Sequence, residues 1–309
     1  MRALQFRQYG PADVVEIAEV PDPHATAGTV RIAVRASGLG TGELRIRAGA
    51  LRNVVPVTFP FRMGFDAAGI VDEVGDGVEG VTVGDEVFGW TDPTQRGANA
   101  ELAVLTAWAH KSASWSWEEA GGAAGSVETA TRVLDIAGTV QGDTVLVHGA
   151  AGATGSVIVQ VAAARGAHVI GTASERNHEF LRSLGAVPTA YGDGMIKRVR
   201  ALAPDRLDAV IDCAGEALPD LVAIAGDAAK VITIADPSAA THGVRMSSGA
   251  TDELAEHGLA EGAALADAGQ LSIPIAAVFP YSEAVAAQEL SETRHARGKI
   301  VLIPDARRP

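Results

Sequence analysis

The sequence predicts an α/β protein of two domains, in which a β-rich outer domain carries an inserted domain built on an open parallel sheet. Three observations predict this fold class. The chain has 309 residues, which is the length of about two domains. Its first third consists of short β-type runs that Gly and Pro interrupt. From about residue 125, apolar strands alternate with helical stretches, a spacing typical of right-handed βαβ units.

The outer domain is predicted from the short runs at 29–35, 68–74 and 85–89. They alternate in polarity or are rich in β-branched residues, and turn residues bound each one, so we expect an irregular β-barrel-like domain. Runs of the same type return near the C-terminus, at 273–279 and 299–303. The last part of the chain therefore resembles the first part, which predicts a discontinuous outer domain.

The inserted domain is predicted from buried-type strands that alternate with helical segments. The strands are expected at 144–148, 168–172, 208–212 and 230–234, and the helices at 154–164, 176–184 and 252–268, with a further helix at 283–290 after the insertion. We place the domain limits at 1–120 with 270–309 for the outer domain and at 121–269 for the doubly wound, parallel-sheet domain.

Composition excludes several classes of protein. The 38 acidic and 25 basic side chains give a formal charge of -13, which disfavours a nucleic-acid partner and an anionic membrane surface. The segment 145–164 lacks charge over about the length of a bilayer span, but Gln160 and three glycines interrupt it, so we interpret it as buried. No secretory signal is recognised at the N-terminus, and a cytoplasmic protein is expected. The single cysteine, Cys213, excludes an intramolecular disulfide and a thiolate-rich zinc site.

A glycine-rich turn is the strongest motif. Gly149, Gly152 and Gly155 are spaced G-x-x-G-x-x-G between a strand and a helix, and Ala153 and Thr154 lie at the expected helix start. Such a turn lets backbone N–H groups approach a pyrophosphate at the helix N-terminus. The second strand ends about twenty residues later, where a dinucleotide site reads the adenosine ribose. The glycine-rich turn and the second strand together predict dinucleotide binding rather than a merely structural turn.

The end of that second strand bears on the choice of cofactor. Ser174 can donate to a phosphate, and Arg176 can pair with it through two hydrogen bonds. Glu175 stands between them; it could accept from a ribose 2′-hydroxyl, or begin the next helix, where an acidic side chain suits the dipole. We favour the helix start, which predicts NADP, with NAD as the alternative.

Four stretches in order carry a resemblance to a known family: 61–71 with 83–89, the turn at 97–101, the segment 145–155 with its partner strand, and 298–304. The sequence resembles the zinc-independent branch of the medium-chain dehydrogenase/reductase superfamily, the quinone oxidoreductase and enoyl reductase group. The resemblance implies a GroES-like catalytic domain and a Rossmann domain, a cofactor in the cleft between them, and a homodimer.

The metal ligands of the zinc-dependent branch are missing from this sequence. Where those enzymes carry Gly-His-Glu, the chain has Gly64, Phe65 and Asp66, and its histidines form no H-E-x-x-H pattern. We therefore expect no zinc. Cys213 is interpreted as a small buried hydrophobe, with a thiol beside the cofactor or a reactive nucleophile as alternatives.

Without a Lewis acid, hydride addition to a quinone or to the β-carbon of an α,β-unsaturated carbonyl is favoured, because the developing enolate is easier to stabilise than an alkoxide. The expected partner is thus a small carbonyl or quinone substrate. The alternatives are a ketone reductase, a pathway-specific enoyl reductase, and a non-catalytic NADPH-binding sensor.

The catalytic side chains are where the sequence departs from the family. The family commonly has Asn-Pro-x-Asp where this chain has Gly40 to Glu43, and Arg45 stands where some quinone reductases have tyrosine. Glu43 and Arg45 lie either at the substrate mouth or on a solvated helical turn with ion pairs. Thr129 matches a family threonine beside the nicotinamide, but could bond its own helix backbone. The resemblance further implies cofactor contacts at Cys213, Ala214, Ile234, Ala235 and Phe279.

Overall fold

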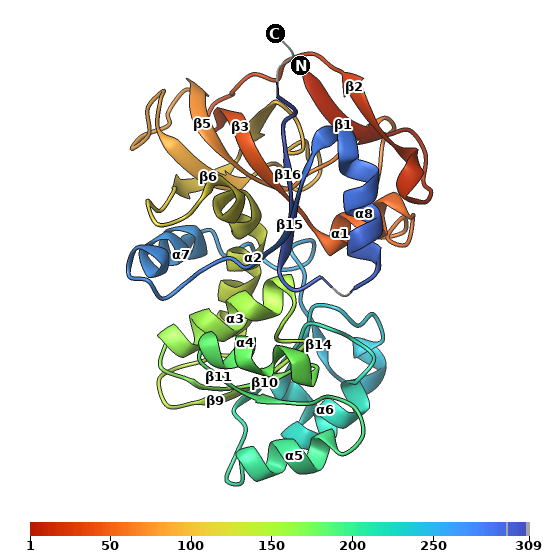
Figure 1. Ribbon diagram of the computed structural model, residues 1–309, viewed down its shortest axis with the longest axis vertical. Coiled ribbons are helices and arrows are strands. Elements are labelled where there is room, and N and C mark those ends of the chain that lie inside the picture. The colour runs from red at the N-terminus through yellow and green to blue at the C-terminus, as the bar shows by residue number, and fades with distance from the viewer. Residues whose placement is uncertain (295, 307–309) are drawn as a thin grey trace. The chain divides into compact units, whose positions relative to one another are not determined.

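The computed structural model describes residues 1–294 and 296–306 and confirms the predicted α/β class. The chain divides into two compact units, Met1–Gly125 with Leu259–Pro309 and Ser126–Gly258 (Figure 1). The predicted functional domains, 1–120 with 270–309 and 121–269, have nearby limits and stay a prediction.

The first unit contains two β-sheets. A seven-stranded sheet has the order β15-β16-β3-β5-β6-β8, with β7 paired to β3, and a three-stranded sheet has the order β2-β1-β4. The strands are β1 (Arg2–Phe6), β2 (Val15–Glu19), β3 (Val30–Leu39), β4 (Phe61–Arg62), β5 (Asp66–Val74), β6 (Glu86–Trp90), β7 (Leu102–Leu105), β8 (Ala107–His110), β15 (Ile275–Pro280) and β16 (Lys299–Ile303). Because β16 pairs antiparallel with β3, the end of the chain completes the sheet that its start began (Figure 1).

Alternation of side chains along β3 explains how this sheet buries its core. Val30, Ile32 and Val34 are buried, as a period of two requires for one face of a strand, and they pack with residues of β5, β6 and β7. The helices of the unit are α1 (Thr41–Arg47), α8 (Ala284–Glu292) and most of α7 (His257–Asp267). The predicted helix at 252–268 begins five residues late, because residues before His257 form a loop.

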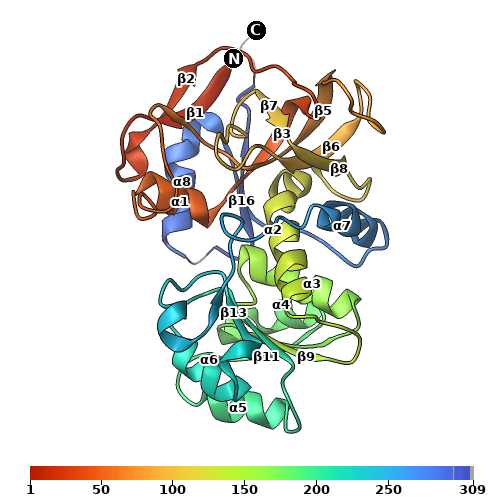
Figure 2. The same cartoon turned by 180° about the vertical axis from the view of Figure 1, so that it is seen from behind.

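The second unit is a doubly wound parallel sheet with the strand order β11-β10-β9-β12-β13-β14. Helices α3 and α4 lie on one face and α5 and α6 on the other (Figures 1 and 2). The strands are β9 (Thr144–His148), β10 (His168–Thr172), β11 (Ala186–Thr189), β12 (Ala209–Asp212), β13 (Val231–Thr233) and β14 (Arg245–Met246). The helices are α3 (Ala153–Ala164), α4 (His178–Ser183), α5 (Met195–Leu202) and α6 (Leu218–Ala225).

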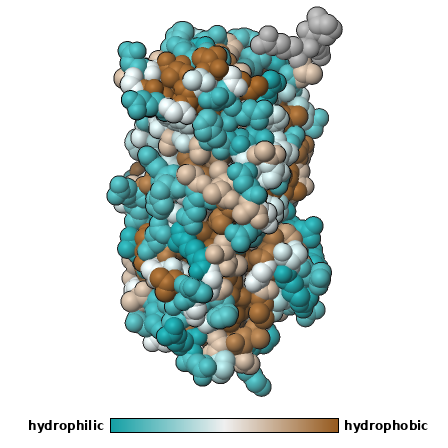
Figure 3. Space-filling view, turned by 90° about the vertical axis from the view of Figure 1, so that its left-hand side faces the viewer, coloured by the Kyte–Doolittle hydropathy of each residue, from teal (hydrophilic) through white to brown (hydrophobic). Residues whose placement is uncertain are grey.

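The uncharged segment 145–164 forms most of β9 and the whole of α3, and most of it is buried, as predicted. In the part of the chain that the structure describes, no helix is both long and apolar enough to cross a membrane. On the face shown in Figure 3, hydrophilic residues cover much of the surface and apolar patches interrupt them.

A long helix, α2 (Trp117–Ile136), begins in the first unit and ends in the second. No helix was predicted over the whole of this stretch, which contains Gly121, Gly122 and Gly125. The structure gives a packing reason for them: a Cβ on Gly121 would lie 2.6 Å from the backbone carbon of Ala36 on β3. Only glycine lets the helix approach the sheet this closely.

Candidate functional site

Each of the three glycines in the turn after β9 has a different structural role. Gly149 has a φ of 76°, and its N–H donates to the Thr172 hydroxyl at 3.1 Å. A Cβ on Gly155 would lie 2.4 Å from the Gly149 carbonyl oxygen, so this glycine allows α3 to pack against the turn. Gly152 caps α3, and a Cβ there would meet only the Gly149 oxygen, at 3.4 Å. The N-terminus of α3 is therefore open on the side of Gly152.

The N–H groups of the first turn of α3 have no partner inside the helix. Ala153, Thr154 and Gly155 contribute three of them, and no acidic side chain lies in that turn. The partial positive charge of a helix N-terminus attracts an anionic group. This arrangement fits a pyrophosphate, and it is built from backbone that the glycines expose.

The turn lies at the point where the strand order of the sheet reverses. β9 has β10 on one side and β12 on the other, and the chain moves outward from β9 in both directions. In open α/β sheets, ligands bind at the carboxyl ends of the strands at such a point. Ala214, which follows β12, comes close: a Cβ on Gly149 would lie 2.9 Å from the Ala214 Cβ.

Hydrogen bonds fix the backbone at the ends of β12 and β13. Asp212 is fully buried, and its carboxylate accepts from the N–H of Ala214 at 3.0 Å and from the hydroxyl of Thr233 at 2.7 Å. Thr233 in turn accepts from the N–H of Ala235 at 3.1 Å, and Ile234 donates its N–H to the Asp212 carbonyl at 2.9 Å. The predicted contact residues thus lie on rigid backbone at the carboxyl edge of the sheet.

Two titratable groups flank this edge in their neutral forms. Burial lowers the pKa of His148, and its Nδ1 lies 2.8 Å from the Thr172 hydroxyl. The same hydroxyl accepts from the Gly149 N–H at 3.1 Å, so Thr172 joins the side chain of His148 to the glycine turn. Burial also raises the pKa of the Cys213 thiol well above its usual range. A thiol that keeps its proton is a poor nucleophile, so the interpretation of Cys213 as a reactive nucleophile is disfavoured.

The residues after β10 present an unpaired cation. Ser174 precedes the 3-10 helix η2 (Glu175–Asn177) and accepts at its hydroxyl from the Asn177 side chain at 3.2 Å. Glu175 opens that helix and is exposed, as the helix-start interpretation expects. Arg176 is exposed, and among the described residues its guanidinium has no hydrogen bond or ion pair. It is free to bind an external anion.

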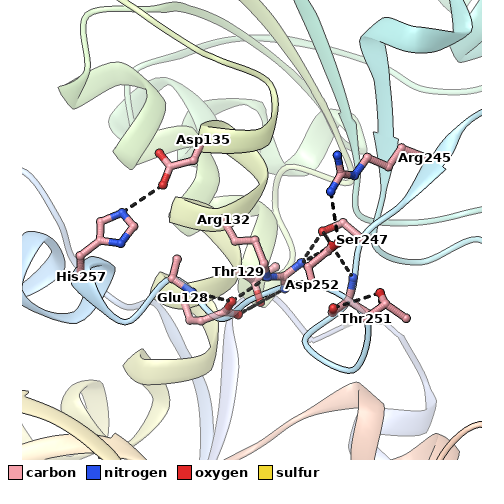
Figure 4. Close-up of polar contacts among 11 residues, drawn as sticks. Glu128, Thr129, Arg132, Asp135, Arg245, Ser247, Thr251, Asp252 and His257 are labelled. Carbon is pink, nitrogen blue, oxygen red and sulfur yellow. Dashed lines mark hydrogen bonds and ion pairs between the residues drawn. The ribbon is translucent and has the colours of Figure 1, made fainter.

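Thr129 belongs to a buried polar network on the second half of α2 (Figure 4). Its hydroxyl donates to the Glu128 carboxylate at 3.1 Å and lies 3.4 Å from the Arg132 guanidinium. The alternative that this hydroxyl bonds its own helix backbone is therefore wrong, because the adjacent carboxylate is the stronger acceptor. Whether Thr129 contacts a nicotinamide stays a prediction.

The same network ties α2 to the loop that follows β14. Arg132 pairs with Glu128 at 2.6 Å and hydrogen-bonds the Ser247 hydroxyl, and Ser247 donates to Asp252 at 2.6 Å (Figure 4). Arg245 also reaches Asp252, at 3.1 Å. These residues were not predicted from the sequence, although a Glu and an Arg four positions apart on α2 are a recognisable helix pair.

In the first unit, Glu43 is a buried carboxyl on α1. Its Oε1 accepts from the Gly64 N–H at 2.7 Å, while its Oε2 has no hydrogen-bond partner. Burial raises the pKa of Glu43 to about 7; Arg96 opposes the rise and Asp66 adds to it. The alternative of a solvated turn is wrong for Glu43, because the side chain is enclosed by the sheet.

The two neighbouring arginines of α1 differ. Arg45 is half-buried, and its side chain has no hydrogen-bond or ion-pair partner among the described residues. Arg47 is fully buried: it donates to Gln288 at 3.0 Å and to the Gly10 carbonyl at 2.7 Å, and it pairs with Glu292. Arg47 is therefore structural, whereas Arg45 remains available to a ligand.

Asp66 and Phe65 occupy the positions where the zinc-dependent branch has its Glu and His. Asp66 forms a buried ion pair with Lys299 of β16 at 2.9 Å. The Phe65 ring stacks on Trp90 at a centroid distance of 6.0 Å, and the Arg96 guanidinium lies 4.6 Å from the Phe65 centroid on its face. In residues 1–294 and 296–306, no three or more His, Cys, Asp or Glu side chains are placed to hold a metal ion.

Phe279, the last predicted contact, lies on β15 at the edge of the seven-stranded sheet. Its ring packs against the apolar core of the first unit, and its neighbour Val278 is exposed instead. The predicted contact of this segment with a nicotinamide stays a prediction.

Comparisons with known proteins match both units. The model of the alcohol dehydrogenase GroES-like domain matches residues 26–134, and that of the zinc-binding dehydrogenase family matches residues 184–302. The chain is 32% identical over 227 residues to a chloroplast envelope quinone oxidoreductase homolog from Arabidopsis thaliana, a match that covers 69% of this chain and 68% of that protein.

Two further relatives agree. A 2-methylene-furan-3-one reductase from Solanum lycopersicum is 32% identical over 232 residues, which is 70% of this chain and 58% of that protein. The solved structure of the quinone oxidoreductase from Coxiella burnetii has a TM-score of 0.75 and 28% identity, and the match covers 98% of this chain and 99% of that one.

The fold, the turn and these matches define an oxidoreductase built from a GroES-like and a Rossmann-type domain. The chain belongs to the quinone oxidoreductase group of the medium-chain dehydrogenase/reductase superfamily, as the sequence resemblance predicted. Members of this superfamily bind NAD or NADP.

Proposed function

We propose that the chain is an NADPH-dependent, metal-free reductase that transfers hydride to a quinone or to the β-carbon of an α,β-unsaturated carbonyl. The observation that carries the cofactor part is the free guanidinium of Arg176 at the carboxyl end of β10. A 2′-phosphate bound there would accept hydrogen bonds from two N–H groups of Arg176. It would also accept one from the hydroxyl of Ser174, a half-buried residue two positions earlier in the chain. The pyrophosphate would meet the open turn at Gly152.

When bound, the nicotinamide supplies the hydride. The chain's own residues hold the dinucleotide through the first turn of α3 and through the fixed backbone at Ala214, Ile234 and Ala235. His148 and Cys213 stay neutral beside them, so they add no charge to the site. Quinone and enone acceptors are compatible with a metal-free reaction, because hydrogen bonds can stabilise the delocalised charge that these acceptors develop.

Fluorescence titration of Arg176→Ala with NADPH and NADH tests the cofactor assignment. Loss of hydrogen bonds to a charged group is worth about 1.5–3 kcal/mol, so we expect NADPH affinity to fall about ten- to hundredfold and NADH affinity to stay unchanged. Arg182→Ala is the control, since Arg182 is an exposed arginine of α4 that pairs with Glu179 at 3.0 Å. Parent-like NADPH binding by Arg176→Ala would show the assignment to be wrong.

The reaction class has its own test. Turnover with deuterium-labelled NADPH over quinones, enones and simple ketones shows where the label arrives, and the proposal expects it on the β-carbon of enones. Label on the carbinol carbon of ketones would indicate a ketone reductase, and NADPH binding without turnover would indicate a sensor. Zinc that survives chelation at one ion per chain would contradict the metal-free mechanism. A homodimer and a cytoplasmic location stay predictions.

A further inference from the structure

Arg96 is held in a fixed loop between β6 and β7. The Asp92 carboxylate accepts from the N–H groups of Thr94 at 2.7 Å and Gln95 at 2.9 Å, and the Asp92 carbonyl accepts from the Arg96 N–H at 2.9 Å. Arg96 itself has a φ of 58°, in the left-handed region that favours glycine. A non-glycine residue in this conformation carries a conformational cost, which the hydrogen bonds of the loop offset at Arg96.

An aromatic platform orients the guanidinium. Trp90 is buried and stacks with the Phe65 ring, and the Arg96 guanidinium lies over a face of that ring, 4.6 Å from its centroid. A cation over a ring face is stabilised without the use of its N–H donors. The Arg96 Nε is buried and has no partner. Among the described residues, none of the side-chain N–H donors of Arg96 forms a hydrogen bond, and the Nε donor is enclosed.

Arg96 is not part of a salt bridge in the described residues, although its charge opposes the rise in the pKa of Glu43 and helps to lower the pKa of Asp92. Among the described residues its side chain forms no ion pair or hydrogen bond. Asp66 forms an ion pair with Lys299, and the Asp92 carboxylate accepts hydrogen bonds from the backbone of its own turn. The Oε2 of Glu43 has no hydrogen-bond partner, and burial raises the pKa of this carboxyl to about 7, so that part of it is protonated near neutral pH. An arginine outside any salt bridge is notable in a chain with a charge of -13.

The place of this cation matters, because Phe65 stands where the zinc-dependent branch has the His of its Gly-His-Glu triplet. We propose that the Arg96 guanidinium takes the part of the missing metal cation and binds the carbonyl oxygen of the hydride acceptor. The assignment rests on the proposed reductase function and adds to it the group that polarises the substrate.

In the proposed reaction NADPH is the reductant: it loses one hydride and is oxidised to NADP⁺. Hydride adds to the β-carbon of the enone, the π electrons of the C=C bond move toward the carbonyl carbon, and those of the C=O bond move onto oxygen. The oxygen then carries the negative charge of the enolate, and the Arg96 N–H donors stabilise it. One proton from solvent completes the saturated ketone; for a quinone, the same sum of one hydride and one proton gives the hydroquinone.

Arg96→Gly is the test, because glycine adopts a φ of 58° without strain and the loop is expected to fold as before. Loss of one oxyanion donor lowers kcat about 10²- to 10³-fold, and we expect a fall of this size with NADPH affinity unchanged. Added guanidinium ion at non-denaturing concentration should restore part of the activity, and ammonium ion should restore less. A merely structural arginine would not give this rescue.

Two further variants sharpen the outcome. Arg96→Lys keeps the charge but loses the planar fork, so its kcat should lie between those of the parent and the glycine variant. Arg35→Gln, an exposed arginine of β3, removes the same charge elsewhere in the unit and should leave kcat unchanged. Parent-like kcat in Arg96→Gly, or a loss without guanidinium rescue, would overturn the assignment of Arg96 alone. Absence of turnover by the parent with every quinone and enone would instead overturn the proposed function.

Discussion

Glu43 gives the sharpest prediction about stability. The pKa of this buried carboxyl is about 7 in the folded protein, against 4.5 for an exposed glutamate. Between these values the folded state holds a proton that the unfolded state has released, so stability falls as pH rises. At about 1.4 kcal/mol per pKa unit, we expect the deprotonated carboxylate to cost about 3 kcal/mol above pH 7, and nothing below pH 4.5.

The variant Glu43→Gln removes this titration and keeps an acceptor for the Gly64 N–H. Its free energy of unfolding should therefore rise relative to the parent by about 3 kcal/mol between pH 4.5 and pH 8. All four tryptophans, at positions 90, 108, 115 and 117, lie in the first unit with Glu43. Denaturant unfolding followed by tryptophan fluorescence thus reports on the right unit.

Glu79→Gln is the matched control, because Glu79 is an exposed glutamate of the same unit. Its unfolding free energy should follow the parent at every pH. If the curves of the parent and of Glu43→Gln run parallel from pH 4.5 to pH 8, Glu43 titrates as an ordinary glutamate and the reasoning from its burial fails.

Two further predictions concern packing. Gly152→Ala should keep the melting temperature of the parent but weaken NADPH binding, because its methyl group meets only one atom, at 3.4 Å, and points into the proposed phosphate site. Gly155→Ala should lower both the melting temperature and the affinity for NADPH, since its methyl group would lie 2.4 Å from the Gly149 oxygen. Equal melting temperatures for the two variants would contradict this. Lys299→Met should destabilise the first unit by about 3–5 kcal/mol, because it leaves the Asp66 carboxylate buried and unpaired. A loss below about 1 kcal/mol in the same fluorescence assay would show that the ion pair is solvated.

The parts of the fold that could be predicted are those whose signals are local. The strand–turn–helix unit around Gly149 and Gly155 has its strand, its glycines and its helix in one continuous segment, and the structure places them as expected. The full extent of α2 was not predicted, and Gly121 is explained only by its close approach to Ala36, which comes from another element. A glycine inside a helical stretch weakens the prediction of a helix until its packing partner is known.

The candidate site shows the same division. Ser174 and Arg176 were predicted from their distance to the glycine turn, and their contact with a cofactor stays a prediction. The place of Arg96 over the Phe65 ring could not be predicted, because Phe65 and Trp90 meet only through the pairing of β5 with β6, where Asp66 lies opposite Trp90. The burial of Glu43 could likewise not be predicted from the local sequence, since a Glu between small residues and arginines has the composition of an exposed turn.

The proposed sites of the two units depend on different groups. In the second unit the proposed cofactor contacts are backbone N–H groups and backbone held by Asp212 and Thr233, with Arg176 as the exposed side chain on which the choice of NADPH would depend. In the first unit the chemistry depends on side chains: a charged carboxylate at Glu43 would attract the Arg96 guanidinium, and a protonated one leaves it free. The oxygen of the hydride acceptor, which becomes negatively charged during the reaction, and an ionised Glu43 carboxylate would therefore compete for the Arg96 guanidinium. Protonation of Glu43 would remove this competition when the acceptor binds. The pKa of Glu43 and the affinity for acceptor are thus linked through Arg96, which predicts that the pH dependence of kcat/KM is set in the first unit rather than at the cofactor.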